Sequence, residues 1–260
     1  MIKAAFFDVD GTLVSIHTKF ITDTLLADLA ELRRRGILIF LATGRAKPDL
    51  EKTGMLKTAE FDGYITLSGQ YCYNKQGLYR DVPICEGDLK NAIRVLQDNP
   101  AIAARMEAGE VTGLTKINDR VRELDAFMHT ALYEIHPPEW MLDRKIYQFV
   151  PLVHEGEEEK FLSVMPNCVW TRWHPKGLDI LPKGDAKADG IRATMELYGL
   201  TREEIIAFGD GDNDLSMFAL AGTAVAMGNA SDAVKSAADH VTDTVENDGV
   251  SKGLRHFGLL

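Results

Sequence analysis

The sequence predicts an α/β protein built on a doubly wound parallel sheet, with an α+β domain inserted into the sheet domain. Short apolar runs at residues 4–9, 37–42 and 64–67 are separated by helix-like segments and short links. Each run stops at small or acidic residues, as parallel strands do where they open onto a ligand crevice. The pattern is interrupted after residue 81 and resumes near residue 183.

The first apolar run, KAAFFDVDGT, predicts a buried strand that ends at two carboxylates, Asp8 and Asp10. Side chains two positions apart in an extended segment share a face, so both acids enter the same space. Like charges ~4 Å apart repel by about 4 kcal/mol at an effective dielectric of ~20. A bound cation or a held proton is therefore expected, although an acidic turn at a strand exit is the simpler alternative.

The elements that follow have recognisable starts and stops. Thr22 is a plausible N-cap for a helix with a leucine stripe that closes before Gly36. A helix from about residue 46 joins the second and third strands, and residues 70–82 predict a hairpin. The inserted segment is predicted to hold helices over residues 86–97, 119–132 and 155–164 and strands over residues 110–117, 146–153 and 169–173.

The sheet domain resumes with a helix that has Lys187 early in it and runs to about Tyr198. A strand over residues 205–208 comes next and is followed directly by GDGDND at 209–214. A strand at 224–227 and a helix at 249–258 close the chain. We therefore predict a core domain in two parts, residues 1–81 and 183–260, around an inserted domain of residues 82–182.

Composition and net charge limit the kinds of molecule that the protein is expected to bind. The chain has 260 residues, 45% of them apolar, and a formal net charge of −10. That charge argues against nucleic acid and against an anionic membrane surface, both of which are bound by surplus Lys and Arg. There is no long apolar window, and the sequence starts at the first strand without a signal peptide, so we expect a cytoplasmic location.

Candidate functional residues gather at the predicted strand ends. The acids are Asp8, Asp10, Asp210 and Asp214, and the residues suited to phosphate are Thr43, Gly44 and Lys187. Oxygen-only ligands without His or Cys suit Mg²⁺. A hydroxyl, free backbone N–H groups and an ammonium are what phosphate oxygens require. The set predicts phosphoryl transfer, in which a carboxylate can itself be the nucleophile.

These motifs resemble those of the haloacid dehalogenase (HAD) superfamily, and in particular the Cof-type class IIB sugar phosphatases with a Rossmann-like core. Four ordered motifs carry the resemblance over the whole chain: DVDGT at 8–12, ATGR at 42–45, the lysine of PKGDAK at 187, and GDGDND at 209–214. The resemblance implies that Asp8 is the nucleophile and that Asp10 is the general acid and then the base.

The same resemblance assigns the binding roles. Thr43 and Lys187 would hold the transferring phosphoryl group, and Gly44, Arg45 and Asn213 would complete the contacts to phosphate or substrate. For Arg45 an exposed first-turn arginine is an equal alternative. Mg²⁺ would lie between Asp8, the Asp10 carbonyl and Asp210, with Asp214 in support from the side. Asp212 has no counterpart in the pattern and is expected at a helix N-cap or facing solvent.

Motif spacing selects the subclass. Thr43 lies 35 positions after Asp8, whereas Lys187 lies 144 positions after Thr43, so only the second interval has room for a domain. This is where family members carry a C2 cap, a lid that closes over the site and contacts the leaving group. One departure from the pattern is Ser68-Gly69, where relatives usually carry Asn-Gly.

The sequence thus predicts a Mg²⁺-dependent phosphatase of small phosphorylated metabolites, most of all sugar (hexose) phosphates, that acts through an aspartyl phosphate. A phosphomannomutase-like phosphotransferase is the alternative within the superfamily. A signalling receiver domain or a non-catalytic phosphate-binding module is the alternative from another class. Receivers place the phosphoacceptor at the end of the third strand, where this chain has Ser68-Gly69.

Overall fold

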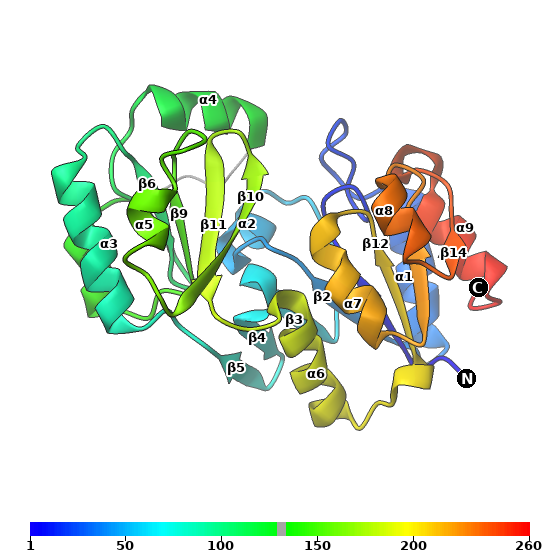
Figure 1. Cartoon of the computed structure of the whole chain (residues 1–260). Coiled ribbons are helices and arrows are strands. Elements are labelled where there is room, and N and C mark those ends of the chain that lie inside the picture. Colours follow the sequence, from blue (N-terminus) through cyan, green and yellow to red (C-terminus); the bar gives the residue numbers. More distant parts are fainter. Residues whose placement is uncertain (129–133) are drawn as a thin grey trace. The chain divides into compact units, whose positions relative to one another are not determined.

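The computed structural model describes residues 1–128 and 134–260 (Figure 1). The chain divides into two compact units. The first unit consists of Met1–Gly44, Gly54–Arg80 and Asp185–Leu260, and the second consists of Arg45–Thr53 and Asp81–Gly184. The short segment after the second strand therefore groups with the insertion and not with the strands on either side of it.

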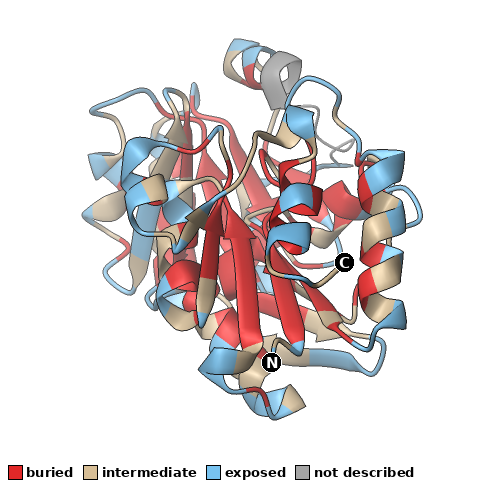
Figure 2. Cartoon of the chain, turned by 90° about the vertical axis from the view of Figure 1, so that its right-hand side faces the viewer, coloured by how far each residue is buried: buried red, intermediate tan, exposed pale blue. Residues whose placement is uncertain are grey.

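The first unit is built on a sheet with the order β14-β13-β12-β1-β2-β3-β4-β5. All neighbours from β14 to β3 are parallel, and β4 pairs antiparallel with β3. The strands are β1 (Ala4–Phe7), β2 (Leu38–Ala42), β3 (Gly63–Thr66), β4 (Tyr71–Asn74), β5 (Gly77–Asp81), β12 (Ile205–Gly209), β13 (Thr223–Ala226) and β14 (His240–Val241). Figure 2 shows that the central strands are buried along their length, as their continuous apolar runs predict.

Helices cover both faces of this sheet. Side chains of α6, α7 and α8 join one apolar cluster with alternate residues of β1, β2, β12 and β13. On the other face, Gly253 of α9 lies against the ring of Phe208. The helices of the first unit are α1 (Asp23–Arg34), α6 (Ala186–Tyr198), α7 (Leu215–Leu220), α8 (Asp232–Ser236) and α9 (Gly249–His256), with 3₁₀ turns at Leu67–Gly69, Arg202–Glu204, Asp212–Asp214 and Val245–Asn247. Thr22 caps α1 as predicted, since its hydroxyl accepts a hydrogen bond from the Leu25 N–H at 3.2 Å.

The second unit has a sheet with the order β10-β11-β9-β6-β7-β8, in which neighbouring strands are antiparallel except β7 and β8, which are parallel. Its strands are β6 (Ala104–Glu107), β7 (Thr112–Leu114), β8 (Glu134–Ile135), β9 (Gln148–Pro151), β10 (Cys168–His174) and β11 (Gly177–Pro182). Its helices are α2 (Lys47–Lys52), α3 (Glu86–Asp98), α4 (Asp119–Met128) and α5 (Glu159–Leu162), with a 3₁₀ segment at Pro138–Asp143. Residues 129–132 of the helix predicted over 119–132 lie outside the described residues.

The two faces of the second sheet differ in chemistry. Met106, Phe149 and Ile180 lie on the face that packs against α3 and α5 in an apolar cluster. The opposite face of β6 carries Arg105 and Glu107, which are 6% and 2% exposed. The Arg105 guanidinium donates to the Asp49 carboxylate of α2 at 2.9 Å and pairs with Glu107 at 2.7 Å. A buried ion network therefore holds α2 to β6 within this unit.

The network makes the stability of the protein depend on pH. Burial raises the pKa of Glu107 to about 7 from an ordinary value of 4.5, although the Arg105 charge opposes this. The native state then holds a proton that the unfolded chain has lost, so stability falls as pH rises from about 4.5 to about 7. We expect wild type to lose ~3 kcal/mol relative to Glu107→Gln across this interval, measured by urea unfolding at several pH values. Parallel curves for the two proteins would contradict the prediction.

The predicted fold class is confirmed: a parallel doubly wound α/β core carries an α+β insertion. Among the described helices, none is both long enough and apolar enough to cross a bilayer.

Candidate active site

The end of β1 presents Asp8. Its backbone N–H donates to the Phe208 carbonyl of β12 at 3.0 Å, and its side chain is almost fully buried. Three residues later the chain turns at Gly11, which has a φ of 81°. Any Cβ at Gly11 would collide with the Asp210 carboxylate, so this position requires glycine for its conformation and for its space. The DVDGT turn therefore lies directly against the acid at the end of β12.

The end of β12 supplies Asp210 and Asp214. One Asp214 oxygen, Oδ2, accepts hydrogen bonds from the backbone N–H groups of Asp210 and Gly211, each at 3.0 Å. Asp210 Oδ1 accepts from the Thr12 hydroxyl at 3.0 Å, and Asp210 Oδ2 accepts from the Asn229 amide at 3.1 Å. These bonds fix the orientation of both carboxylates.

Lys187 lies in the first turn of α6 and is completely buried. Its ammonium donates to Asp8 Oδ1 and to Asp214 Oδ1, both at 2.6 Å. Two buried carboxylates and one buried ammonium are tolerable only as this hydrogen-bonded group, because an isolated charge in the interior is very costly. Burial by itself would lower the pKa of Lys187, but the charges and hydrogen bonds of Asp214 and Asp8 outweigh burial and raise that pKa above its ordinary value, so Lys187 stays protonated.

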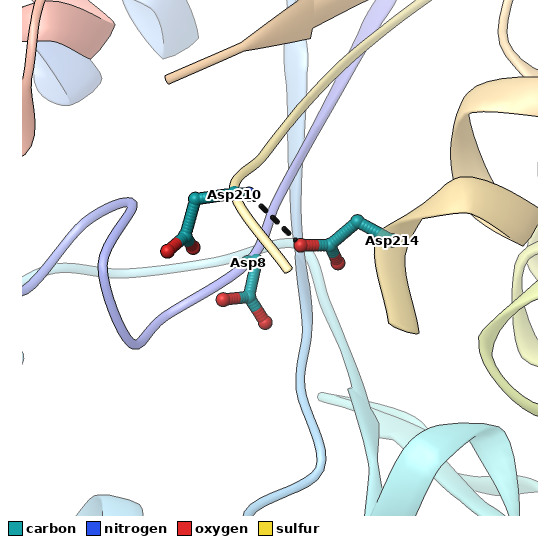
Figure 3. A group of neighbouring side chains, drawn as sticks. All are labelled: Asp8, Asp210 and Asp214. Carbon is teal, nitrogen blue, oxygen red and sulfur yellow. Dashed lines mark hydrogen bonds between the residues drawn. The ribbon is translucent and has the colours of Figure 1, made fainter. Parts of the chain in front are cut away.

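The carboxylates outnumber the ammonium. Ligand oxygens of Asp8, Asp210 and Asp214 all lie within 4.8 Å of one another (Figure 3). Burial raises the pKa of Asp8 well above its ordinary value, and the carboxylates of Asp214, Asp210 and Asp10 raise it further against the effect of Lys187. Burial likewise raises the pKa of Asp210 to about 6. A second cation would relieve this excess of negative charge.

The donor set fits a hard divalent cation. All three side chains offer carboxylate oxygens, and none of them offers the nitrogen or sulfur ligands that favour zinc. Carboxylates and carbonyls are the ligands that Mg²⁺ takes, together with water. Asp8 and Asp210 are the predicted side-chain ligands, and Asp214 is tied to Lys187 and to two backbone N–H groups, in keeping with a supporting place.

The predicted phosphate residues Thr43 and Gly44 follow β2, the strand next to β1. Thr43 is 1% exposed, and its backbone is held on both sides: its N–H donates to the Ile65 carbonyl at 2.8 Å, and its carbonyl accepts from the Ser68 N–H at 3.0 Å. Asp10 is half-buried, and its charge acts on both Asp8 and Asp210. The parallel strands thus bring the carboxyl ends of β1, β2 and β12 to one edge of the sheet.

The hydrogen bonds described above do not involve three further residues that the sequence analysis considered: Asn213, Asp212 and Arg45. Asn213 is exposed, and its amide oxygen turns back toward Gly211, 2.5 Å from where a Cβ on that glycine would lie. Asp212 is exposed, in agreement with its expected solvent-facing position. Arg45 is the first residue of the segment that belongs to the second unit, so its contact with substrate stays a prediction.

Two partners of Asp210 were not predicted from the sequence. Thr12 is part of the DVDGT motif, yet only the fold shows that its hydroxyl reaches across to β12. Asn229 follows β13, and its amide also donates to the Gly11 carbonyl at 2.9 Å. The available signal for Asn229 was its place after a parallel strand, the same signal that identified Asp8 and Asp210.

Comparison with known proteins agrees with this geometry. A family model described as haloacid dehalogenase-like hydrolase matches residues 5–254. The YkrA protein of Bacillus subtilis (strain 168), provisionally named a phosphatase, is 32% identical over 263 residues, which cover 99% of this chain and 98% of the relative. Pyridoxal phosphate phosphatase YbhA of Escherichia coli (strain K12) is 26% identical over 271 residues, covering 92% and 94% of the two chains.

Solved structures show the same likeness. The HAD subclass IIB sugar phosphatase BT4131 superposes with a TM-score of 0.88 at 33% identity, covering 99% of this chain and 100% of that one. BT1666 of Bacteroides thetaiotaomicron, described among phosphatases of the haloalkanoate superfamily, gives 0.88 at 34% identity and covers 100% and 96%. The family match spans nearly the whole chain, and these four relatives align over 94–100% of their own length. The protein therefore belongs to the haloacid dehalogenase-like hydrolase family, and it is a phosphatase of that family.

Proposed function

We propose that this protein is a Mg²⁺-dependent phosphatase of small phosphorylated metabolites, with sugar phosphates as the leading substrate class, and that Asp8 is its nucleophile. The observation that supports this most is the buried group at the strand ends, in which Lys187 bridges Asp8 and Asp214 at 2.6 Å. The arrangement fixes a carboxylate beside a permanent positive charge. Phosphoryl transfer is catalysed mainly by such positioning and charge neutralisation.

The residues have the following roles in this proposal. An Asp8 oxygen attacks phosphorus, the bond from phosphorus to the alcohol oxygen breaks, and Asp10 gives its proton to the departing alcohol. Water then attacks the phosphorus of the aspartyl phosphate while Asp10 takes the proton, which releases inorganic phosphate and restores Asp8. Lys187, the Thr43 hydroxyl and the backbone around Gly44 hold the phosphoryl oxygens throughout.

Asp8 and Asp210, with the Asp10 carbonyl, would hold Mg²⁺, which supplies positive charge to the phosphoryl oxygens. We expect EDTA to lower kcat at least ~100-fold and added Mg²⁺ to restore it, while Ca²⁺, which prefers more ligands and longer bonds, restores little. The measurement is phosphate release from p-nitrophenyl phosphate after dialysis against each solution. Full activity in the chelator would contradict the assignment of these acids to a metal.

Assays of the purified protein distinguish a phosphatase from the two alternatives, a phosphate-binding module and a phosphotransferase. Steady turnover of p-nitrophenyl phosphate would exclude a pure phosphate-binding module. A phosphotransferase of the phosphomannomutase kind would need a bisphosphorylated sugar activator and would release no net phosphate. We expect net phosphate release without an activator.

A screen of phosphorylated metabolites would then identify the substrate class. Hexose phosphates belong in it because BT4131 is described as a sugar phosphatase, and pyridoxal phosphate belongs in it because YbhA is named for it. We propose that the insertion, residues 82–182, is a C2-type cap that selects the alcohol part of the ester. A preference for non-sugar esters across the screen would replace sugar phosphates as the leading class.

A further inference from the structure

The turn after β3 has an unusual backbone. Leu67, Ser68 and Gly69 have φ values of 49°, 52° and 88°, so three successive residues lie in the left-handed region. Only glycine adopts this region without a steric penalty, and Leu67 and Ser68 both carry a Cβ. Both side chains are buried, at 0% and 7% exposed. A conformation of this kind persists only where the surrounding structure imposes it.

On one side, the turn is bonded to the residue that is proposed to hold phosphate. The Ser68 N–H donates to the Thr43 carbonyl at 3.0 Å. The Ser68 hydroxyl oxygen lies 3.4 Å from the position that a Cβ on Gly44 would occupy. Ser68 therefore contacts Thr43 through its backbone and lies beside Gly44 with its side chain.

On the other side, the turn contacts the helix that carries Lys187. A Cβ on Gly190 of α6 would lie 2.9 Å from the Gly69 Cα, so helix and turn are in close contact. The Gly69 carbonyl accepts from Arg80 Nε at 2.8 Å, and the same guanidinium pairs with Asp189 of α6 at 3.6 Å. The turn thus lies between the two elements that supply Thr43 and Lys187.

We infer that Ser68 is a positioning residue for phosphate binding: its left-handed backbone sets the distance between the Thr43–Gly44 turn and the Lys187 helix. This inference rests on the proposed function, which places the phosphoryl group at Thr43 and Lys187. The property that matters is the backbone conformation and not the hydroxyl. Residues that tolerate the left-handed region should then replace Ser68, and β-branched residues should not.

The test compares four variants at one position. Ser68→Asn and Ser68→Gly tolerate a positive φ and are expected to keep kcat/KM for p-nitrophenyl phosphate within about threefold of wild type. Ser68→Val and Ser68→Thr resist it, and we expect kcat/KM to fall by ~10–100-fold, since a displacement of about 1 Å can cost ~100-fold. Ser68→Thr keeps the hydroxyl and adds one methyl group, so it decides the question if Ser68→Val does not fold.

Lys57 offers a matched control, because it is exposed and has a φ of 48°. Lys57→Thr puts threonine in the same left-handed backbone conformation as Ser68→Thr does. We therefore expect the Tm of both variants to fall by ~5 °C, whereas Lys57→Thr should keep the kcat/KM of wild type. Equal loss of activity in Lys57→Thr would overturn the inference, because general destabilisation would then explain the result. Loss of activity in both Ser68→Gly and Ser68→Val, with activity kept in Ser68→Thr, would also overturn it, because the missing hydroxyl would then be the cause.

A binding measurement separates this inference from the proposed function. Inorganic phosphate should raise the Tm of wild type and of Ser68→Asn, and should raise that of Ser68→Thr much less. A protein that binds phosphate in this pattern but turns over no ester would refute the proposed function and still support the positioning role. Equal phosphate-dependent shifts in all variants would refute the positioning role alone.

Discussion

Asp8→Asn is expected to abolish phosphate-ester turnover and to leave the fold intact. The amide keeps the volume of the side chain and can still accept the Lys187 hydrogen bond, but it is not a nucleophile. Burial and three nearby carboxylates already raise the pKa of Asp8, so removing its charge relieves repulsion. We expect kcat to fall more than ~1,000-fold, with a circular dichroism spectrum and a Tm close to those of wild type.

The matched control is Asp212→Asn, the same chemical change at an exposed acid in the GDGDND loop. Its kcat should equal that of wild type. Activity of Asp8→Asn above about a thousandth of the wild-type value would remove Asp8 from the role of nucleophile. A large fall in the Tm of Asp8→Asn would instead show that the carboxylate is needed for folding.

Lys187→Met is expected to remove activity and to destabilise the protein. The methionine has a similar length but leaves the buried carboxylates of Asp8 and Asp214 without their shared cation. Removing one partner of a buried ion pair typically costs about 3–5 kcal/mol, which corresponds to a fall in Tm of ~10 °C for a chain of this size. The measurements are thermal unfolding and phosphate release on the same preparation.

Two further variants separate the effect on stability from the effect on catalysis. Arg192→Met changes a cation on the same helix whose ion pairs with Asp185 and Asp189 are at the surface, and it should alter Tm by only about 1–2 °C. Adding Asp214→Asn to Lys187→Met removes one unpaired buried charge, so the double variant should regain part of the lost Tm and none of the activity. A double variant that is less stable than Lys187→Met would contradict the account of this charge group.

The strands that carry the candidate site could be predicted because their signals are local. Continuous apolar runs become strands buried on both faces, and the acids and small residues after them mark the carboxyl ends. Parallel pairing then brings Asp8 and Asp210 together although they are far apart in the chain. The site assignments themselves came from motif resemblance, because spacing alone does not give a residue its role.

Features that depend on contacts between distant segments could not be predicted. The burial of Arg105 and Glu107 on β6 was not predicted, because charged residues that alternate with apolar ones indicate a strand with one face in solvent. In the structure both side chains are buried, and Arg105 pairs with Glu107 and with Asp49. The hydrogen bond from Asn229 to Asp210 joins two loops that only the sheet brings together. The left-handed conformation of Ser68 has no sequence signal, since serine is ordinary in turns.

The grouping of Arg45–Thr53 with Asp81–Gly184 has a consequence for protein engineering. A chimera that exchanges only residues 81–184 with a relative would keep Asp49 but replace Arg105. The buried Asp49 carboxylate would then lose the guanidinium that donates to it. A graft that carries residues 45–53 as well would transfer the ion network whole. Modular recombination among such phosphatases should therefore use two crossover segments and not one.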